Sequence, residues 1–189
     1  HGDRGRARRA AEPLENVPLQ LYCVDSLPEA FRHERPRFIV TGSPSMPASE
    51  PTACPLRRIL ARGRVMPILT IQDIATAAPL ARALVAGGVH VFEVVLRTAV
   101  AFDAVREMKA AAPEADVGMG TLLTAEDVEK AVAAGASFGV SPGLTDRLAD
   151  AVAAHGFPFL PGVATPSEVM AACESGFDAL KYFPANGAA

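Results

Sequence analysis

The feature that most constrains the fold of this chain is an alternation of apolar runs with alanine-rich segments, from Val65 to Tyr182. Runs typical of buried strands lie at residues 65–69, 91–96, 117–119, 138–140, 159–160 and 179–182. In the second half of the chain these runs recur about every 21 residues. Strands and helices that alternate with short connections imply right-handed β-α-β units and a parallel sheet.

The expected helices have boundary signals of their own. Thr124 and Thr165 each precede an acidic first turn that they can cap, and Pro166 occupies the first helical position. Glycines follow four of the alanine-rich segments, where a left-handed cap is expected: Gly87, Gly135, Gly156 and Gly176.

The loops distinguish between an open doubly wound sheet and a closed barrel. No Gly-x-Gly-x-x-Gly motif follows the first strand. Polar or conformationally special residues instead follow several strand ends: Arg97-Thr98, Gly120-Thr121, Ser141-Pro142-Gly143, Gly162-Val163-Ala164-Thr165 and Lys181. A site built from many strand ends is typical of a β/α barrel, whereas an open sheet gathers its ligand groups at one switch point. We therefore expect an α/β protein of the (β/α)8 TIM-barrel class, with about six units in this chain.

The first part of the chain differs from the rest. Residues 1–64 contain eight prolines, no lysine and no sustained period, a pattern typical of poor order. We predict that residues 1–45 are an irregular extension, disordered or non-native, and that residues 46–189 form the working domain. An arginine-rich arm near the N-terminus leaves open a transit peptide or a tether to an anionic surface.

Composition narrows the classes of partner and compartment. With 50% apolar residues, the 189-residue chain can bury one sizeable core. Residues 65–189 carry seven basic and fourteen acidic residues, which argues against nucleic-acid binding. No apolar run reaches the length of a membrane span. The three cysteines, Cys23, Cys54 and Cys173, have no metal-like spacing and are expected to be reduced thiols of a cytoplasmic protein.

Lys181 is one of three lysines and the only one within an apolar run. Burial disfavours an ammonium ion, lowers its pKa and increases the fraction of free amine, the form that attacks a carbonyl carbon. Lys181 is therefore a candidate Schiff-base nucleophile. The alternative is a lysine at a strand end whose ammonium reaches water.

Glu93 and Arg97 share one face of the expected strand at residues 91–96 and lie about 13 Å apart along it. Glu93 is expected deep in the barrel and Arg97 at its mouth. A carboxylate within an apolar strand is costly unless it is paired or binds a proton. Glu93 can therefore be the general acid/base, the structural partner of Lys181 across the barrel, or both.

Four motifs resemble the 2-keto-3-deoxy-6-phosphogluconate (KDPG) and 4-hydroxy-2-oxoglutarate (KHG) aldolase family. They are Gly87-Gly88-Val89-His90-Val91-Phe92-Glu93-Val94-Val95-Leu96-Arg97-Thr98, Gly118-Met119-Gly120-Thr121, Ser141-Pro142-Gly143-Leu144-Thr145 and Leu180-Lys181-Tyr182-Phe183-Pro184-Ala185. The resemblance covers about residues 52–187. It implies a homotrimeric class I aldolase without a metal or other cofactor, which releases pyruvate and glyceraldehyde 3-phosphate from its small-molecule substrate.

By motif, the resemblance implies that Lys181 forms the imine and that Glu93 moves the protons. It implies that Arg97 and Thr121 hold the pyruvate carboxylate, and both side chains are suitable donors. The alternative for Thr121 is a turn residue that orders the loop before the next helix. Pro142 and Phe183 match pocket-lining positions, although a turn former and a core aromatic remain open readings of them.

The resemblance also raises an expectation about the extent of the chain. The family continues through two further strands beyond Ala189, and these carry the phosphate-binding loops. We therefore expect the last two barrel strands to be missing here. A catalytically incompetent fragment, or a non-catalytic binding subunit that keeps part of a pyruvate site, remains the alternative to an active aldolase.

Overall fold

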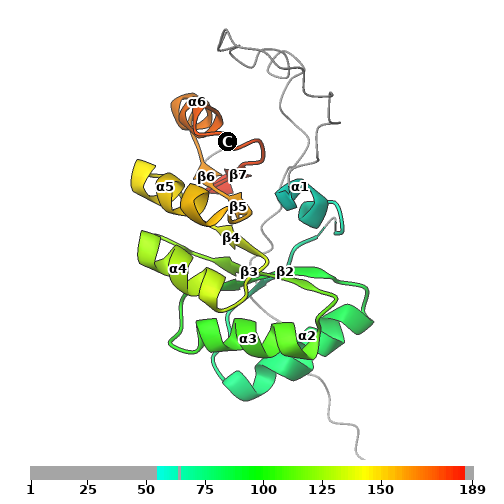
Figure 1. The fold of residues 1–189 in the computed structure, drawn as a ribbon. Coiled ribbons are helices and arrows are strands. Elements are labelled where there is room, and N and C mark those ends of the chain that lie inside the picture. The colour runs from blue at the N-terminus through cyan, green and yellow to red at the C-terminus, as the bar shows by residue number, and fades with distance from the viewer. Residues whose placement is uncertain (1–54, 64, 186–189) are drawn as a thin grey trace, which may run out of the picture.

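The computed structural model describes residues 55–63 and 65–185, which alternate between strands and helices as the sequence predicts (Figure 1). The strands are β1 (Ile68–Leu69), β2 (Val91–Val95), β3 (Asp116–Gly120), β4 (Phe138–Val140), β5 (Phe159–Leu160), β6 (Gly162–Val163) and β7 (Lys181–Tyr182). The helices are α1 (Pro55–Leu60), α2 (Ala77–Ala86), α3 (Ala101–Ala111), α4 (Ala125–Ala133), α5 (Asp146–His155) and α6 (Pro166–Glu174), with a 3₁₀ turn, η2 (Ile74–Thr76), before α2. The predicted extension at residues 1–45 lies outside the described residues.

The strands run parallel in the order of the chain, from β1 to β5, and β6 pairs in parallel with β7. The expected parallel sheet is therefore confirmed. In Figure 1 helices α2 to α6 follow one another around one side of the strands, and α1 lies apart from them. This is the arrangement of part of a β/α barrel, in which helices form an outer ring. No helix in the described ranges is long and apolar enough to cross a membrane.

The fifth apolar run is longer than the sequence analysis predicted. β5 pairs with β4 on one side, and β6, directly after Pro161, pairs with β7 on the other. Proline has no N–H to donate, but its carbonyl accepts a hydrogen bond of 2.9 Å from the backbone N–H of Lys181. The extended run therefore connects the two sheets and holds Lys181 in register. The predicted strands at 65–69 and 179–182 are shorter than expected, at two residues each.

Alternate side chains of the strands face two different cores. Phe92, Val94, Val117 and Met119 belong to the core shared with the outer helices. The inner core contains Val91, Phe138, Val140, Leu160 and Ala179, together with Leu56 and Leu60 of α1. Helix α1 therefore covers the barrel interior with Leu56 and Leu60.

The predicted helix starts are confirmed, and one predicted helix end is wrong. Thr124 and Thr165 both form capping boxes. Gly135, Gly156 and Gly176 have positive φ, as expected, but Gly87 has a φ of −84° and the left-handed residue is Gly88. The N–H of Gly87 still donates to Ala83 and Leu84, so the helical turn continues one residue further than the sequence suggested.

Replacement of Phe138 by alanine is expected to lower the free energy of unfolding by about 3–5 kcal/mol. The Phe138 side chain is fully buried in the inner core, and its ring fills the space left by Gly118, so truncation leaves a cavity. Denaturant unfolding would measure the change. Phe102→Ala, at a partly buried position on α3, is the control and should cost clearly less; equal losses would contradict the prediction.

Candidate active site

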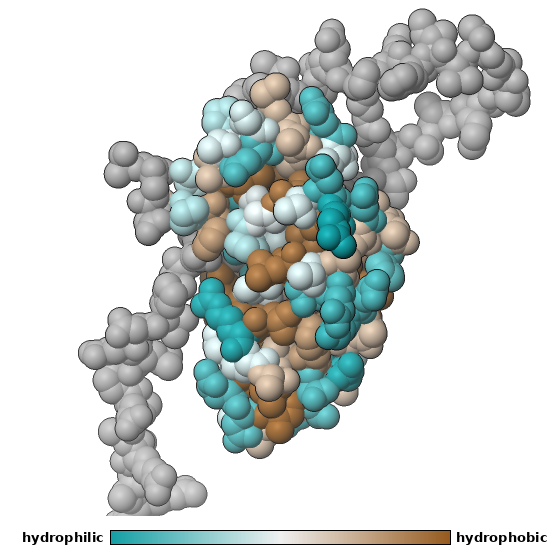
Figure 2. Space-filling view, turned by 90° about the vertical axis from the view of Figure 1, so that its left-hand side faces the viewer, coloured by the Kyte–Doolittle hydropathy of each residue, from teal (hydrophilic) through white to brown (hydrophobic). Residues whose placement is uncertain are grey.

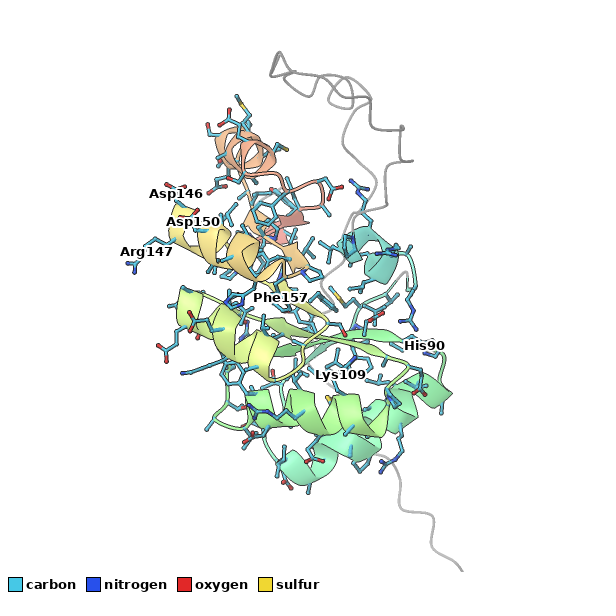
Figure 3. The ribbon with its side chains drawn as sticks, viewed as in Figure 1. His90, Lys109, Asp146, Arg147, Asp150 and Phe157 are labelled. Carbon is cyan, nitrogen blue, oxygen red and sulfur yellow. The ribbon has the colours of Figure 1, made fainter. Side chains whose placement is uncertain are left out.

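The carboxyl ends of the strands lie on one face of the molecule. Figure 3 shows in which direction the parallel strands run, from right to left. His90, just before the start of β2, lies on the right, and Asp146, which opens α5 after the end of β4, lies on the left. Figure 2 looks onto that left-hand side, where apolar and weakly polar residues occupy the middle of the face and hydrophilic residues surround them. All six residues singled out from the sequence belong to strands or loops that lead to this face.

Lys181 opens β7 and points into the barrel, because its side chain is only 8% exposed while that of the next residue, Tyr182, is exposed. Burial lowers the pKa of Lys181, the Glu93 carboxylate opposes this shift, and the Arg97 guanidinium adds to it. More of the amine is therefore unprotonated near neutral pH than in an ordinary lysine. Snorkelling to water, the alternative reading of this residue, does not fit its burial.

Phe183 forms an apolar wall beside the lysine. The Nζ atom of Lys181 lies 4.9 Å from the centroid of the Phe183 ring. The bond from Phe183 to Pro184 is cis. The ring therefore adds apolar surface beside the buried amine.

Glu93 lies in the middle of β2 with only 1% of its side chain exposed. Its Cα pairs with Gly118 of β3, but its Oε1, Cδ and Cγ atoms lie against Gly120, two residues further along that strand. The side chain therefore extends toward the carboxyl ends of the strands. Its charge acts on Lys181, so the structure brings together the two residues that the sequence proposed as acid/base and nucleophile.

Arg97 follows the end of β2 and is exposed. Its backbone N–H donates to the carbonyl of Val95 at 2.9 Å, a tight turn at the strand end. Its guanidinium charge acts on Lys181. A cation at the mouth of the barrel can hold a carboxylate close to the buried amine.

Thr121 follows β3 and has a φ of 64°, the only positive φ of a non-glycine residue in the described ranges. A β-branched residue rarely adopts this conformation, and such strain is concentrated at functional sites. The residues on either side of Thr121 are fixed. Gly120 accepts a hydrogen bond from the N–H of Leu96, and Leu122 donates one to Val140. The strained backbone thus positions Thr121 at the ends of three neighbouring strands.

Pro142 lies in the loop after β4, beside the strand partner of the lysine. Its carbonyl oxygen occupies the space that a Cβ on Gly162 would need, and Gly162 pairs with Lys181. The buried hydroxyl of Ser141 donates to the carbonyl of Gly143 at 2.6 Å and so fixes the loop.

Ser141, Gly120 and Gly162 stand in strand-end motifs, but the sequence predicted no role for them. Each is defined by a neighbour that the fold brings close. Ser141 contacts the carbonyl of Gly143, Gly120 lies against the carboxylate of Glu93, and Gly162 lies against the backbone of Pro142. In the part of the chain that the structure describes, no three His, Cys, Asp or Glu side chains come together as a metal site would require.

Fold and site define a class of protein: a β/α barrel whose candidate site centres on a buried lysine beside a buried carboxylate at the strand ends. The chain belongs to the KDPG and KHG aldolase family, whose sequence model matches residues 56–189.

Individual relatives agree with this assignment. The chain is 44% identical over 127 residues to the KHG/KDPG aldolase of Escherichia coli K12, an alignment that covers 67% of this chain and 60% of the relative. It is 50% identical over 121 residues to the 2-dehydro-3-deoxy-phosphogluconate aldolase of Zymomonas mobilis, covering 64% of this chain and 58% of that protein. The chain thus spans about 60% of the length of these relatives.

Solved structures resemble the same part of the chain. The KDPG aldolase of Zymomonas mobilis, crystallised with 3-phosphoglycerate, matches with a TM-score of 0.67 and 45% identity, over 70% of this chain and 63% of that one. The Legionella pneumophila KDPG aldolase, with pyruvate captured as a covalent carbinolamine, matches with a TM-score of 0.67 and 41% identity, over 70% and 64% of the two chains. The expected (β/α)8 barrel class is therefore confirmed, with part of the barrel described here.

Proposed function

We propose that this protein acts as a class I aldolase that cleaves KDPG to pyruvate and glyceraldehyde 3-phosphate, and KHG to pyruvate and glyoxylate. The observation that supports this most is the buried amine of Lys181, its pKa lowered by burial, within the electrostatic reach of Glu93. The carbinolamine captured in the Legionella relative is the product of an amine adding to the carbonyl of pyruvate, which is the step that Lys181 would perform.

In the proposed mechanism the free amine of Lys181 attacks the C2 carbonyl carbon of the substrate and forms a carbinolamine. Glu93 supplies the proton with which the hydroxyl leaves as water, so that a protonated imine remains. The iminium draws the electron pair of the C3–C4 bond as this bond breaks, and the Glu93 carboxylate accepts the proton of the C4 hydroxyl as the aldehyde forms. Glu93 then returns a proton to C3 of the enamine, and water hydrolyses the imine to release pyruvate.

The other four residues would bind the substrate. Arg97 presents a planar fork of donors to the carboxylate of the pyruvate moiety, and the Thr121 hydroxyl adds a directional donor. Pro142 and Phe183 would line the pocket beside the reacting carbon. Arg97 also favours the free amine of Lys181, so one residue would anchor the substrate and activate the nucleophile.

The proposal includes a homotrimer that works in the cytoplasm and needs no metal or other cofactor, on the strength of the family resemblance. Sedimentation equilibrium would give the mass of the assembly, and turnover in the presence of a strong chelator would test the metal-free chemistry. A monomer, or activity lost with the chelator, would contradict these parts of the proposal.

Reductive trapping with pyruvate tests the central claim. Borohydride reduces an imine to a stable amine, and mass spectrometry should place the pyruvate-derived adduct on Lys181. A coupled assay of pyruvate release from KDPG then tests turnover. An adduct without turnover would favour a binding subunit or an incompetent fragment, and the absence of an adduct would refute the aldolase mechanism.

Replacement of Arg97 by glutamine should shift the pH dependence of imine formation to higher pH. The guanidinium lowers the pKa of Lys181, so its loss raises this pKa and leaves less free amine at neutral pH. The KM for pyruvate should also rise about 10- to 100-fold, since a charged hydrogen bond is worth roughly 1.5–3 kcal/mol. Trapping rates across pH would measure both effects.

Arg82→Gln, at an exposed position on α2, is the matched control and should leave the pH profile unchanged. If the pH profile and the KM of Arg97→Gln both coincide with those of the control, Arg97 neither activates the lysine nor binds the carboxylate.

A further inference from the structure

Two glycines follow Asp116 on the inner face of β3. Gly118 and Gly120 alternate with Val117 and Met119, which face the outer helices. A Cβ on Gly118 would overlap the ring of Phe138 from β4, and a Cβ on Gly120 would overlap Oε1 of Glu93 from β2. The missing side chains of β3 thus leave room for one large side chain from each neighbouring strand.

The space at Gly120 determines the direction in which Glu93 extends. In the strand register Glu93 lies opposite Gly118, and Val95 lies opposite Gly120. Two residues of strand correspond to about 6.6 Å, so the carboxylate lies nearer the carboxyl ends of the strands than its own Cα does. Those ends carry Arg97 and Thr121, and the charge of Glu93 acts on Lys181 from this position.

We propose that Gly120 is a positioning residue for catalysis. Because residue 120 has no side chain, the Glu93 carboxylate can occupy the space from which it exchanges protons with the Lys181 adduct. This inference rests on the proposed aldolase function. Gly120 itself touches no reacting atom and acts only through Glu93.

Gly120 is not required for the two usual reasons, a positive φ or the close approach of another backbone. Its φ is not positive, so an alanine there meets no backbone strain. The atoms in the way belong to the flexible end of Glu93, whereas at Gly162 they belong to the backbone of Pro142. The Gly120→Ala variant should therefore fold. We expect the added methyl group to displace the Glu93 carboxylate and to leave β3 in place.

The experiment compares four variants of the whole protein with the wild type: Gly120→Ala, Gly118→Ala, Glu93→Asp and the double variant Gly120→Ala/Glu93→Asp. Gly118→Ala, on the same strand as Gly120, is the matched control, because its Cβ meets another buried side chain, the Phe138 ring of β4, and not the carboxylate. Aspartate is one methylene shorter than glutamate and lacks the atom that would lie nearest the added Cβ, so the overlap is smaller in the double variant. Crystal structures give the carboxylate position, and turnover and pyruvate trapping across pH give its consequences.

Gly120→Ala is expected to displace the Glu93 carboxylate and to lower kcat on the order of 10²-fold, the low end of the contribution of a positioned acid/base, with little change in KM. Gly118→Ala should leave the carboxylate in place and change kcat much less. The double variant should recover about tenfold of the kcat lost in Gly120→Ala, which a merely structural role of Gly120 would not produce.

A carboxylate that stays in place in the crystal structure of Gly120→Ala would overturn the inference. So would a double variant no more active than Gly120→Ala. Failure of the proposed function has a different signature, because wild-type protein would then give no pyruvate adduct on Lys181. Even if the aldolase function fails, the crystal structures of the wild type and of Gly120→Ala would still show whether residue 120 determines the position of the Glu93 carboxylate.

Discussion

Replacement of Lys181 by alanine is expected to abolish the pyruvate adduct and to lower kcat on the order of 10⁶-fold, as when other enzymes lose their covalent nucleophile. The reason is that Lys181 combines burial with a lowered pKa. Neither of the other two lysines lies in the barrel interior: Lys109 donates to Ala115 and Ser137, and Lys130 pairs with Glu126 on the surface. Borohydride trapping with peptide mapping and steady-state turnover would measure both losses.

Lys130→Ala is the matched control, since it removes a lysine from an exposed helix position and should leave trapping and turnover unchanged. An adduct that persists in Lys181→Ala would assign the chemistry to another amine.

Lys181→Arg separates the nucleophile from a structural ion pair. Arginine keeps the positive charge opposite Glu93 but does not lose its proton in proteins. If Lys181 served only to pair with Glu93, the arginine variant would retain much of the activity. We expect it to form no adduct and to be as inactive as the alanine variant, while remaining folded by circular dichroism.

The architecture was largely predictable because each barrel unit repeats the same local pattern. Strand β4 and strand β5 begin and end where the apolar runs do, and the two threonine capping boxes follow directly from local sequence. The error at Gly87 arose between two adjacent glycines, where local sequence does not fix which one leaves the helix. The extension of the fifth run through Pro161 depends on pairing with β7, a long-range contact.

The sequence was enough to identify the candidate residues of the site, but not to predict how their side chains and backbone are arranged. Alternation along a strand placed Glu93 inside, and an isolated lysine in an apolar run marked Lys181. The sequence could not reveal that the Glu93 carboxylate lies over Gly120, nor that Thr121 has a positive φ. Both depend on strand register and on neighbours 18 or more residues away. Backbone geometry of this kind appears only once the strands are paired.

Replacement of Glu93 by glutamine is expected to lower kcat by about 10²- to 10⁴-fold, the usual contribution of general acid–base catalysis. Glutamine has nearly the same shape and can occupy the same space over Gly120, but it cannot exchange a proton. The loss should appear in kcat more than in KM. Pyruvate trapping and turnover across pH would measure it, with Glu126→Gln, at an exposed position on α4, as the control.

The pH dependence of Glu93→Gln distinguishes acid–base catalysis from ion pairing. The Glu93 carboxylate raises the pKa of Lys181 against the effect of burial, so its removal lowers this pKa further and increases the free amine near neutral pH. If Glu93 only paired with the lysine, imine formation in the variant would be at least as fast as in the wild type, with its pH midpoint moved down. If Glu93 transfers protons, imine formation is slower at every pH although more of the amine is free. We expect the second result, because a nucleophile without a proton donor cannot expel the carbinolamine hydroxyl as water.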